Sequence, residues 1–371
     1  MPSSTSSSER LTAADRPGVA QPVPTREIPD RPWWPILFGA LLLAVTLTGA
    51  WEWHWRGFGA VPGYRDDEAM WARQRRRIDA GAGDATVLVG SSRTLFDLQL
   101  RVWQRLSGRR PIQLAIVGTS PLSVLEDLAN DPAFTGRLVI GIAPDIFFSG
   151  REYRGTFVRY AAKETPSQRV GKILSMHLVE PWFAFYDPDF ALFPLLRRQA
   201  WPTRKGAPDH LQVRKILVME ADRNTHMWSK LETDANYRAL ARRIWAQEFN
   251  DPPPTAAKAA ENRRTLDQQI ARTAAAIAKL RARGIAMVFM RAPSAGEYLA
   301  YENRVYPRRT TWDVLLAKSG TPGIHFEDYP TLQGYDLPEW SHMTKASAEG
   351  YTKAFYGILE RKYPLTGAAH W

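Results

Sequence analysis

The stretch Thr86-Val87-Leu88-Val89-Gly90-Ser91-Ser92-Arg93 decides the fold of this chain. Its first four residues are apolar or β-branched, which is typical of a short buried strand. A turn of small residues comes next, and a helical pattern then runs from Leu95 to Leu106. We expect that helix to end at Gly108, because glycine adopts the left-handed conformation that closes many helices. A strand, a tight turn and a helix in this order indicate the start of a parallel α/β sheet.

Four further apolar runs continue this alternation of strands and helices. They lie at 112–117, 138–142, 285–290 and 323–326, and a helix with one apolar face is expected over 265–283. Short apolar strands separated by helices are typical of a parallel sheet that is covered on both faces. The predicted fold class is therefore α/β with a parallel sheet.

Two segments depart from this rhythm. Residues from about 150 to 255 are rich in aromatic side chains and end in Asp251-Pro252-Pro253-Pro254, which predicts a mainly helical insertion. Its aromatic rings suit core packing better than stacking on sugar rings. The stretch 66–79 contains Arg73, Arg75, Arg76 and Arg77, and is predicted to be a solvated helix that leads into the domain.

A transmembrane anchor is predicted over residues 33–53. No charged residue occurs from Pro32 to Trp51, and about 20 helical residues span roughly the 30 Å of bilayer hydrocarbon. Tryptophans flank the apolar run on both sides, as expected of indole rings at the two membrane interfaces. The preceding residues 1–32 are rich in Ser and Pro and are predicted to be a disordered tail.

This anchor indicates a single-pass protein of the inner (cytoplasmic) membrane, with a large domain over 66–361 on the periplasmic, extracytoplasmic side. The formal net charge is +11, which suits anionic lipid, an acidic glycan or nucleic acid. An exported domain argues against nucleic acid as the partner. The chain contains no Cys, which excludes disulfides and thiolate metal sites.

Ser92 is the candidate nucleophile. Ligands of open parallel sheets bind at the carboxyl ends of the strands, because loops and helix N-termini converge there. Ser92 follows the first predicted strand and begins a helix, so we expect its hydroxyl at that edge with free backbone N–H groups nearby. The alternative is that Ser92 only caps the helix. A nucleophilic serine also needs an adjacent base.

His342 is the candidate base. It lies in the loop Asp336-Leu337-Pro338-Glu339-Trp340-Ser341-His342, ahead of the last predicted helix. A carboxylate beside an imidazole fixes its tautomer and stabilises its charged form. Glu339 and Asp336 are both close enough in sequence to play that part. The alternative is an ordinary surface histidine.

Together these features resemble the SGNH/GDSL hydrolase superfamily. The resemblance is carried by Gly90-x-Ser92 after the first strand, Gly118 after the second, and Glu339-x-x-His342 before the last helix. More narrowly, Gly-Ser-Ser-Arg with Pro-Glu-Trp-Ser-His resembles membrane-anchored members linked to exopolysaccharide or cell-envelope acylation. The resemblance implies a three-layer, flavodoxin-like SGNH-type sheet. It also implies an oxyanion hole formed by the N–H groups of Ser92 and Gly118.

The sequence departs from the family pattern at two places. Ser91 stands where many members have Asp, and residues 141–145 contain no Asn to serve as the third oxyanion donor. Asp145, in that segment, cannot donate when it is ionised. Arg93 and Arg291 are candidate substrate-binding residues that could replace this donor, with a structural ion pair as the alternative for Arg291. No spacing of His, Asp and Glu suggests a metal site, and no cofactor is predicted.

The predicted function is serine-dependent acyl-ester chemistry, with O-acetyl transfer to or from an exported or envelope polysaccharide through an acyl-Ser92 intermediate. By the resemblance, a multi-span membrane acyltransferase would be the partner that supplies the acyl group. Two alternatives stay open. One is an esterase that uses water. The other is a non-catalytic glycan-binding or scaffold protein that has kept the fold, which the missing Asn favours.

Overall fold

The computed structural model describes residues 31–197, 215–247, 249 and 253–363. The chain divides into two units, Met1–Trp51 and Glu52–Trp371. Helix α1 (Trp33–Phe58) has a window of mean hydropathy 1.7 with none of its residues buried, so it is long and apolar enough to cross a membrane. The tail predicted over 1–32 lies, except for its last two residues, outside the described residues.

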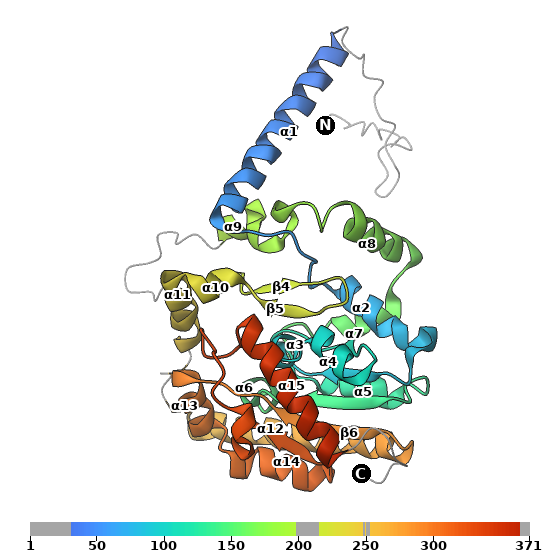
Figure 1. Ribbon diagram of the computed structural model, residues 1–371, viewed down its shortest axis with the longest axis vertical. Helices are drawn as coiled ribbons and strands as arrows, with labels where there is room; N and C mark the ends of the chain where they lie inside the picture. The colour runs from blue at the N-terminus through green and yellow to red at the C-terminus, as the bar shows by residue number, and fades with distance from the viewer. Residues whose placement is uncertain (1–30, 198–214, 248, 250–252, 364–371) are drawn as a thin grey trace, which may run out of the picture. The chain divides into compact units, whose positions relative to one another are not determined.

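The second unit contains a parallel sheet of five strands in the order β2-β1-β3-β6-β7 (Figure 1). The strands are β1 (Thr86–Val89), β2 (Ile112–Gln113), β3 (Arg137–Gly141), β6 (Ala286–Arg291) and β7 (Gly323–His325). The predicted α/β class with a parallel sheet is confirmed, and every predicted strand is present. Strand β2 is shorter than predicted, although Leu114 and Ile116 still donate backbone hydrogen bonds to Leu88 and Gly90.

Side chains of the strands alternate between two hydrophobic cores, one on each face of the sheet. Val87 and Phe289 enter the core that includes α5 (Leu122–Asn130), α12 (Ala256–Ala282) and α14 (Trp312–Ser319). Leu88 and Val288 enter the core that includes α4 (Leu100–Ser107) and α15 (Lys345–Lys362). Successive residues of a strand point to opposite faces of the sheet. Because helices cover both faces, nearly every strand residue is buried, and the strands are apolar along almost their whole length.

Helix α2 (Glu68–Arg77) corrects one prediction. The stretch 66–79 is helical as predicted, but it is not a solvated connector, because Met70, Trp71 and Arg75 are buried. The Trp71 indole N–H donates to the Leu114 carbonyl at 2.9 Å, on the continuation of β2. Arg75 forms ion pairs with two acids near α5. Some charged side chains of this helix therefore make structural ion pairs that its sequence pattern does not reveal.

Helix α3 (Ser92–Asp97) begins directly after β1 and is separate from α4, where the sequence predicted one continuous helix. Thr94 of α3 lies against Gly90 and Gly141, at the ends of β1 and β3. A Cβ atom added to Gly90 would lie 2.0 Å from Thr94 Oγ1, and one added to Gly141 would lie 1.7 Å from it. Only glycine therefore lets α3 approach the strand ends this closely, and this approach places Ser92 at the carboxyl edge of the sheet.

The insertion predicted over about 150–255 consists mainly of helices, as far as it lies within the described residues. They are α7 (Phe157–Lys163), α8 (Pro166–Leu178), α9 (Leu192–Arg197), α10 (Ser229–Thr233) and α11 (Ala235–Ala246). An antiparallel hairpin of β4 (Leu217–Met219) and β5 (Thr225–Met227) was not predicted. Two further helices of the domain are α6 (Pro144–Phe147) and α13 (Gly296–Val305).

Replacing Gly141 by Ala is expected to destabilise the protein by about 1–3 kcal/mol, because the new methyl group overlaps Thr94 and α3 must move. Gly171→Ala is the matched control. Gly171 lies inside helix α8 with open space around its Cα, so alanine there should stabilise by about 0.5–1 kcal/mol. Denaturant unfolding of the two variants in detergent measures both effects, and equal stabilities would contradict the close approach of α3.

Candidate active site

A buried imidazole–carboxylate pair lies in the loop before α15. The His342 ring is 2% exposed and Glu339 is fully buried. His342 Nδ1 lies 2.8 Å from Glu339 Oε1, and the His342 backbone N–H donates to the same oxygen at 2.6 Å. An ionised carboxylate only accepts, so Nδ1 carries the proton and Nε2 is left with its lone pair. The ring is thus held in the tautomer that a general base requires.

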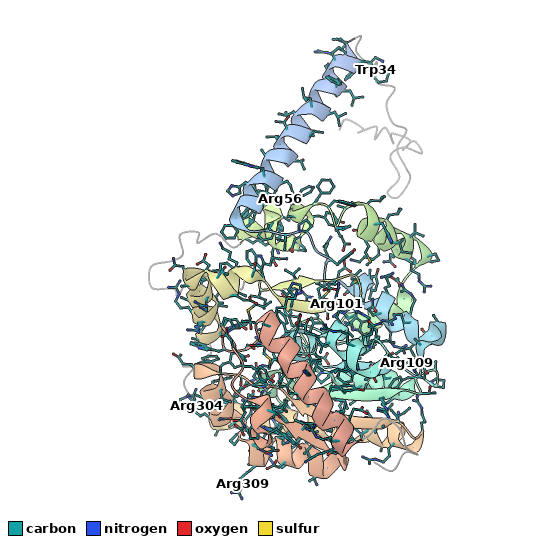
Figure 2. All side chains as sticks on the ribbon, viewed as in Figure 1. Trp34, Arg56, Arg101, Arg109, Arg304 and Arg309 are labelled. Atoms are coloured by element: carbon teal, nitrogen blue, oxygen red, sulfur yellow. The ribbon has the colours of Figure 1, made fainter. Side chains whose placement is uncertain are left out.

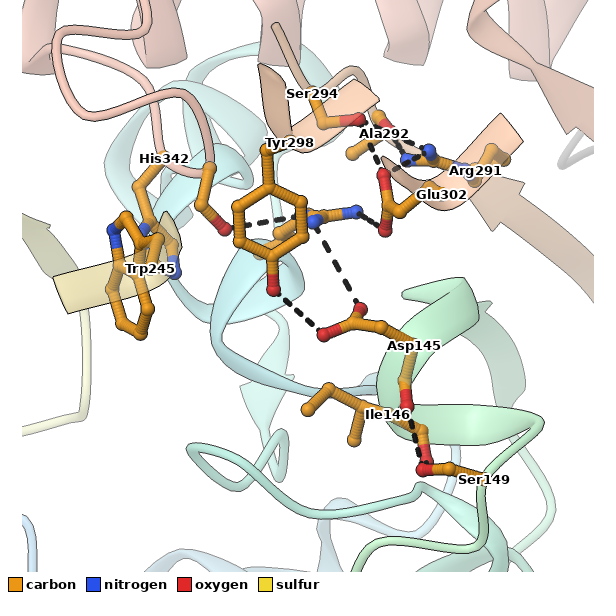
Figure 3. A network of polar contacts seen from close by, with 12 residues as sticks. Asp145, Ile146, Ser149, Trp245, Arg291, Ala292, Ser294, Tyr298, Glu302 and His342 are labelled. Carbon is orange, nitrogen blue, oxygen red and sulfur yellow. Dashed lines mark hydrogen bonds and ion pairs between the residues drawn. The ribbon is translucent and has the colours of Figure 1, made fainter. Parts of the chain in front are cut away.

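The insertion contributes a third donor to this pair. The indole N–H of Trp245, in α11, donates to Glu339 Oε2, so both oxygens of the carboxylate are engaged. The Trp245 and His342 ring centroids are 6.3 Å apart, and Figure 3 shows the two rings beside each other. Because charged acceptors form strong hydrogen bonds in buried surroundings, these three donors stabilise Glu339 as an anion. No sequence spacing points to Trp245.

The loop that carries the pair has a strained backbone. Trp340 has a φ of 72°, a left-handed conformation that is uncommon for a bulky residue. Its carbonyl accepts a hydrogen bond from the Ala295 N–H at 2.8 Å, and its ring lies over Gly296, where a Cβ would be 2.6 Å from the indole nitrogen. Backbone strain of this kind persists only where surrounding contacts enforce it, and it is concentrated at functional sites.

Three contacts join helix α3 to this loop. Arg93 Nε donates to Ser341 Oγ at 3.3 Å, and the Met343 N–H donates to Asp97 Oδ1 at 3.3 Å. Between them, the Phe96 ring packs on the His342 ring with centroids 4.3 Å apart. Residues four apart lie on one face of a helix, so Ser92 is one turn from Phe96 on the side of α3 that faces His342.

The structure therefore brings the predicted nucleophile and base into one neighbourhood, without a direct bond between them. Ser92 is half-buried, and His342 Nε2 is buried with no hydrogen-bond partner among the described residues. Ser91, the residue before Ser92, is almost completely buried at the N-cap of α3. Asp336, the competing acid, is exposed, and Glu339 is the acid bonded to His342. The catalytic roles of these residues stay predictions.

Gly118, the other predicted oxyanion donor, lies at the same edge of the sheet. It follows Ile116, which bonds to Gly90 just before α3. Gly118 has a φ of 62° and its carbonyl accepts from the Tyr153 N–H at 3.2 Å. Its own N–H has no acceptor among the hydrogen bonds of the described residues. The first-turn N–H groups of α3, including that of Ser92, likewise have no partner within their helix.

Arg93 and Arg291, the predicted substrate-binding residues, form a buried ion-pair network with Glu302 of α13. Figure 3 labels Arg291 and Glu302 of this network. Glu302 Oε1 lies 2.7 Å from Arg93 Nη1, and Oε2 lies 2.8 Å from Arg291 Nη2. Burial raises the pKa of Glu302, but the positive charges of Arg291 and Arg93 outweigh it and keep the pKa below its ordinary value. The network is structural, and substrate contact by either arginine stays a prediction.

Asp145, where the family pattern expects Asn, lies at the other end of this network. The Tyr298 hydroxyl donates to Asp145 Oδ2 at 2.6 Å, and Arg93 lies 4.0 Å from Oδ1. A dashed line in Figure 3 joins Tyr298 and Asp145. Burial and the negative charge of Glu302 raise the pKa of Asp145. Tyr298 and Glu302 were not predicted. Their spacing of four residues in a polar helix after the fourth predicted strand was the available signal. Within the described ranges no group of acids and histidines could hold a metal ion.

Glu302→Gln is expected to destabilise the fold by about 3–5 kcal/mol, because it leaves two buried guanidinium groups without their shared anion. Glu126→Gln is the control. Glu126 pairs with Arg272, whose side chain is 51% exposed, and such surface pairs contribute about 0–1 kcal/mol. Thermal or denaturant unfolding compares the two, and a Glu302→Gln protein as stable as the control would contradict the network.

No family model matches the chain, and no curated protein matches it. Membership of the SGNH/GDSL superfamily therefore stays an expectation from the motifs.

Proposed function

We propose that this chain is a serine-dependent acyl-ester enzyme, with Ser92 as nucleophile, His342 as base and Glu339 as the orienting carboxylate. The observation that supports this most strongly is the buried His342 ring. Its Nδ1 is bonded to Glu339 and its Nε2 has no partner among the described residues. A histidine buried only for packing would be expected to satisfy both ring nitrogens.

The surroundings of Ser92 suit the reaction that a free Nε2 would assist. Ser92 Oγ would attack an acyl carbonyl carbon while His342 Nε2 takes its proton, and the imidazolium that forms would be stabilised by Glu339. The N–H groups of Ser92 and Gly118 would bind the carbonyl oxygen as its negative charge develops. His342 would return the proton to the leaving alcohol. An acceptor hydroxyl would then attack the acyl-Ser92 ester while His342 Nε2 takes its proton, and that proton would return to Ser92 Oγ as the acyl group leaves. Catalytic hydrogen bonds are often incomplete without substrate, which fits the missing contact between Ser92 and His342.

The sheet adds support for an SGNH-type, three-layer, flavodoxin-like fold. Its strands follow the order 2-1-3-4-5 when they are numbered within the sheet, which is the flavodoxin-like order. The proposed substrate is an exported or envelope polysaccharide that gains or loses an O-acetyl group, and α1 would anchor the chain in the inner membrane with the domain on the periplasmic side. A multi-span membrane acyltransferase would supply the acyl group. No nucleic acid or cofactor is needed.

The network around Asp145 bears on the missing oxyanion donor. A carboxyl group with a raised pKa is protonated more readily and can then donate a hydrogen bond, as an Asn side chain does. Asp145 Oδ1 has no hydrogen-bond partner among the described residues. Asp145 in its protonated form is our candidate for the third oxyanion donor, and a non-catalytic scaffold stays the alternative that the missing Asn favours. Hydrolysis by water stays the second candidate, since the same residues would carry it out.

Labelling with a fluorophosphonate probe tests the nucleophile. The wild-type protein and Ser91→Ala are expected to react, because Ser91 is a buried N-cap residue, whereas Ser92→Ala should not react. Folding of each variant is checked by its far-UV circular dichroism. Equal labelling of Ser92→Ala and wild type, or loss of labelling only in Ser91→Ala, would refute the assignment of Ser92.

The orienting acid is tested by comparing Glu339→Gln with Asp336→Asn on an acetylated oligosaccharide. Glu339→Gln should lower kcat by roughly 10²–10⁴-fold, because an amide cannot stabilise the imidazolium and can hold the wrong tautomer. Asp336 is exposed and is not bonded to His342, so Asp336→Asn should leave kcat nearly unchanged. The reverse ranking would assign the role to Asp336. Measuring the free acetate released and the acetate transferred to an added glycan distinguishes hydrolysis from transfer.

A further inference from the structure

Large exposed apolar side chains lie on two helices of the insertion and on the turn that follows the first of them. They are Val170, Ile173, Leu174 and Leu178 of α8, Trp182 and Phe183 in the following turn, and Leu192, Phe193 and Leu196 of α9. We call these nine residues the apolar platform. Their exposed fractions range from 42% at Phe183 to 63% at Trp182 and Phe193. Soluble surfaces rarely gather this many large apolar side chains, and such gatherings mark sites of contact with protein or membrane.

The platform side of α8 is a complete amphipathic face. Val170, Ile173, Leu174 and Leu178 follow the spacing of a single helix face. Lys172 and Met176, on the opposite side of the helix, are buried against the domain, where Lys172 pairs with Glu180 at 2.9 Å. The helix is therefore already anchored by its inward side. The outward apolar side chains belong to none of the three hydrophobic cores of the described residues.

The platform adjoins the segment that follows the candidate membrane span. The backbone N–H groups of Ala184 and Phe185 donate to the Glu52 carboxylate at 2.9 Å and 2.8 Å. Arg56 donates to the Trp182 carbonyl at 2.8 Å. Figure 2 shows Arg56 at this end of the domain, with Arg304 and Arg309 toward the other end. Glu52 comes directly after the uncharged run that ends at Trp51, so the turn that carries Trp182 and Phe183 is bonded to the residues that follow this run.

We propose that the apolar platform lies in the interfacial layer of the same bilayer that α1 spans. A protein partner could also cover exposed apolar side chains, but the position beside the end of the span favours lipid. Trp182 has the amphipathic ring that prefers the interface, and the Arg197 guanidinium lies 4.3 Å from the Phe193 ring centre, where it can reach lipid headgroups. The proposal does not depend on the acyl chemistry.

Because the chain contains no Cys, single cysteines can report on the platform in the full-length protein. Leu174→Cys and Phe193→Cys place a bimane label on it. Leu106→Cys and Val305→Cys are matched controls, since these side chains are apolar and 40% and 44% exposed outside it. A label at Leu41→Cys checks that α1 is inserted. Each protein is reconstituted in phosphatidylcholine–phosphatidylglycerol vesicles, with nitroxide-labelled lipid or aqueous iodide as quencher.

Labels at 174 and 193 should be quenched by lipid nitroxide near the headgroups and shielded from iodide, because interfacial helices sit about 5–10 Å into the headgroup and acyl boundary. The controls should show the opposite pattern. Quenching of the platform labels by iodide, as in the controls, would overturn the proposal. Shielding from both quenchers would also overturn it, in favour of a protein occupant. A label at 41 that nitroxide lipid does not quench would overturn it as well, since the platform rests on a membrane-spanning α1.

Discussion

The burial of the Glu339 carboxylate beside His342 is the interaction on which the rest of the site depends. A fully buried anion is costly unless its oxygens are satisfied, and here the donors are the backbone and ring N–H groups of His342 and the indole of Trp245. Each donor has to come from a different direction. The left-handed backbone at Trp340 and the bare Gly296 beneath its ring are local features of the loop that carries the two His342 donors.

A second constraint is the short distance between α3 and the sheet. The two glycines that face Thr94 bring α3 onto the ends of β1 and β3, and the other side of α3 then meets the His342 loop through Arg93, Phe96 and Asp97. Arg93 also reaches Glu302, so the helix that begins at Ser92 is tied to both the loop and α13. The helix that begins at Ser92 is thus held by contacts with the sheet, the loop and α13.

The sequence was most informative where structure is local. Five apolar runs predicted the five strands because burial on both faces requires apolar residues throughout, and Glu339 and His342 could be paired because they are three residues apart. Long-range polar contacts left no such pattern. Trp245 reaches Glu339 across 94 positions, and the charged residues of α2 looked solvated because their partners lie elsewhere in the chain. Nor did any local pattern reveal the break between α3 and α4, where Gln99 bonds to Phe96 and Thr225.

Trp245 also shows why the insertion cannot be treated as an addition to a complete site. Helix α11 carries Tyr237 and Trp245, which are eight residues apart and therefore lie on one side of the helix. The Tyr237 ring packs 6.5 Å from that of Phe58, the last residue of α1, while Trp245 bonds to Glu339. A single short helix thus connects the end of α1 to the carboxylate beside His342. Removing the insertion would take away the indole donor of Glu339 Oε2, so the site and the segment next to the candidate membrane span depend on the same helix.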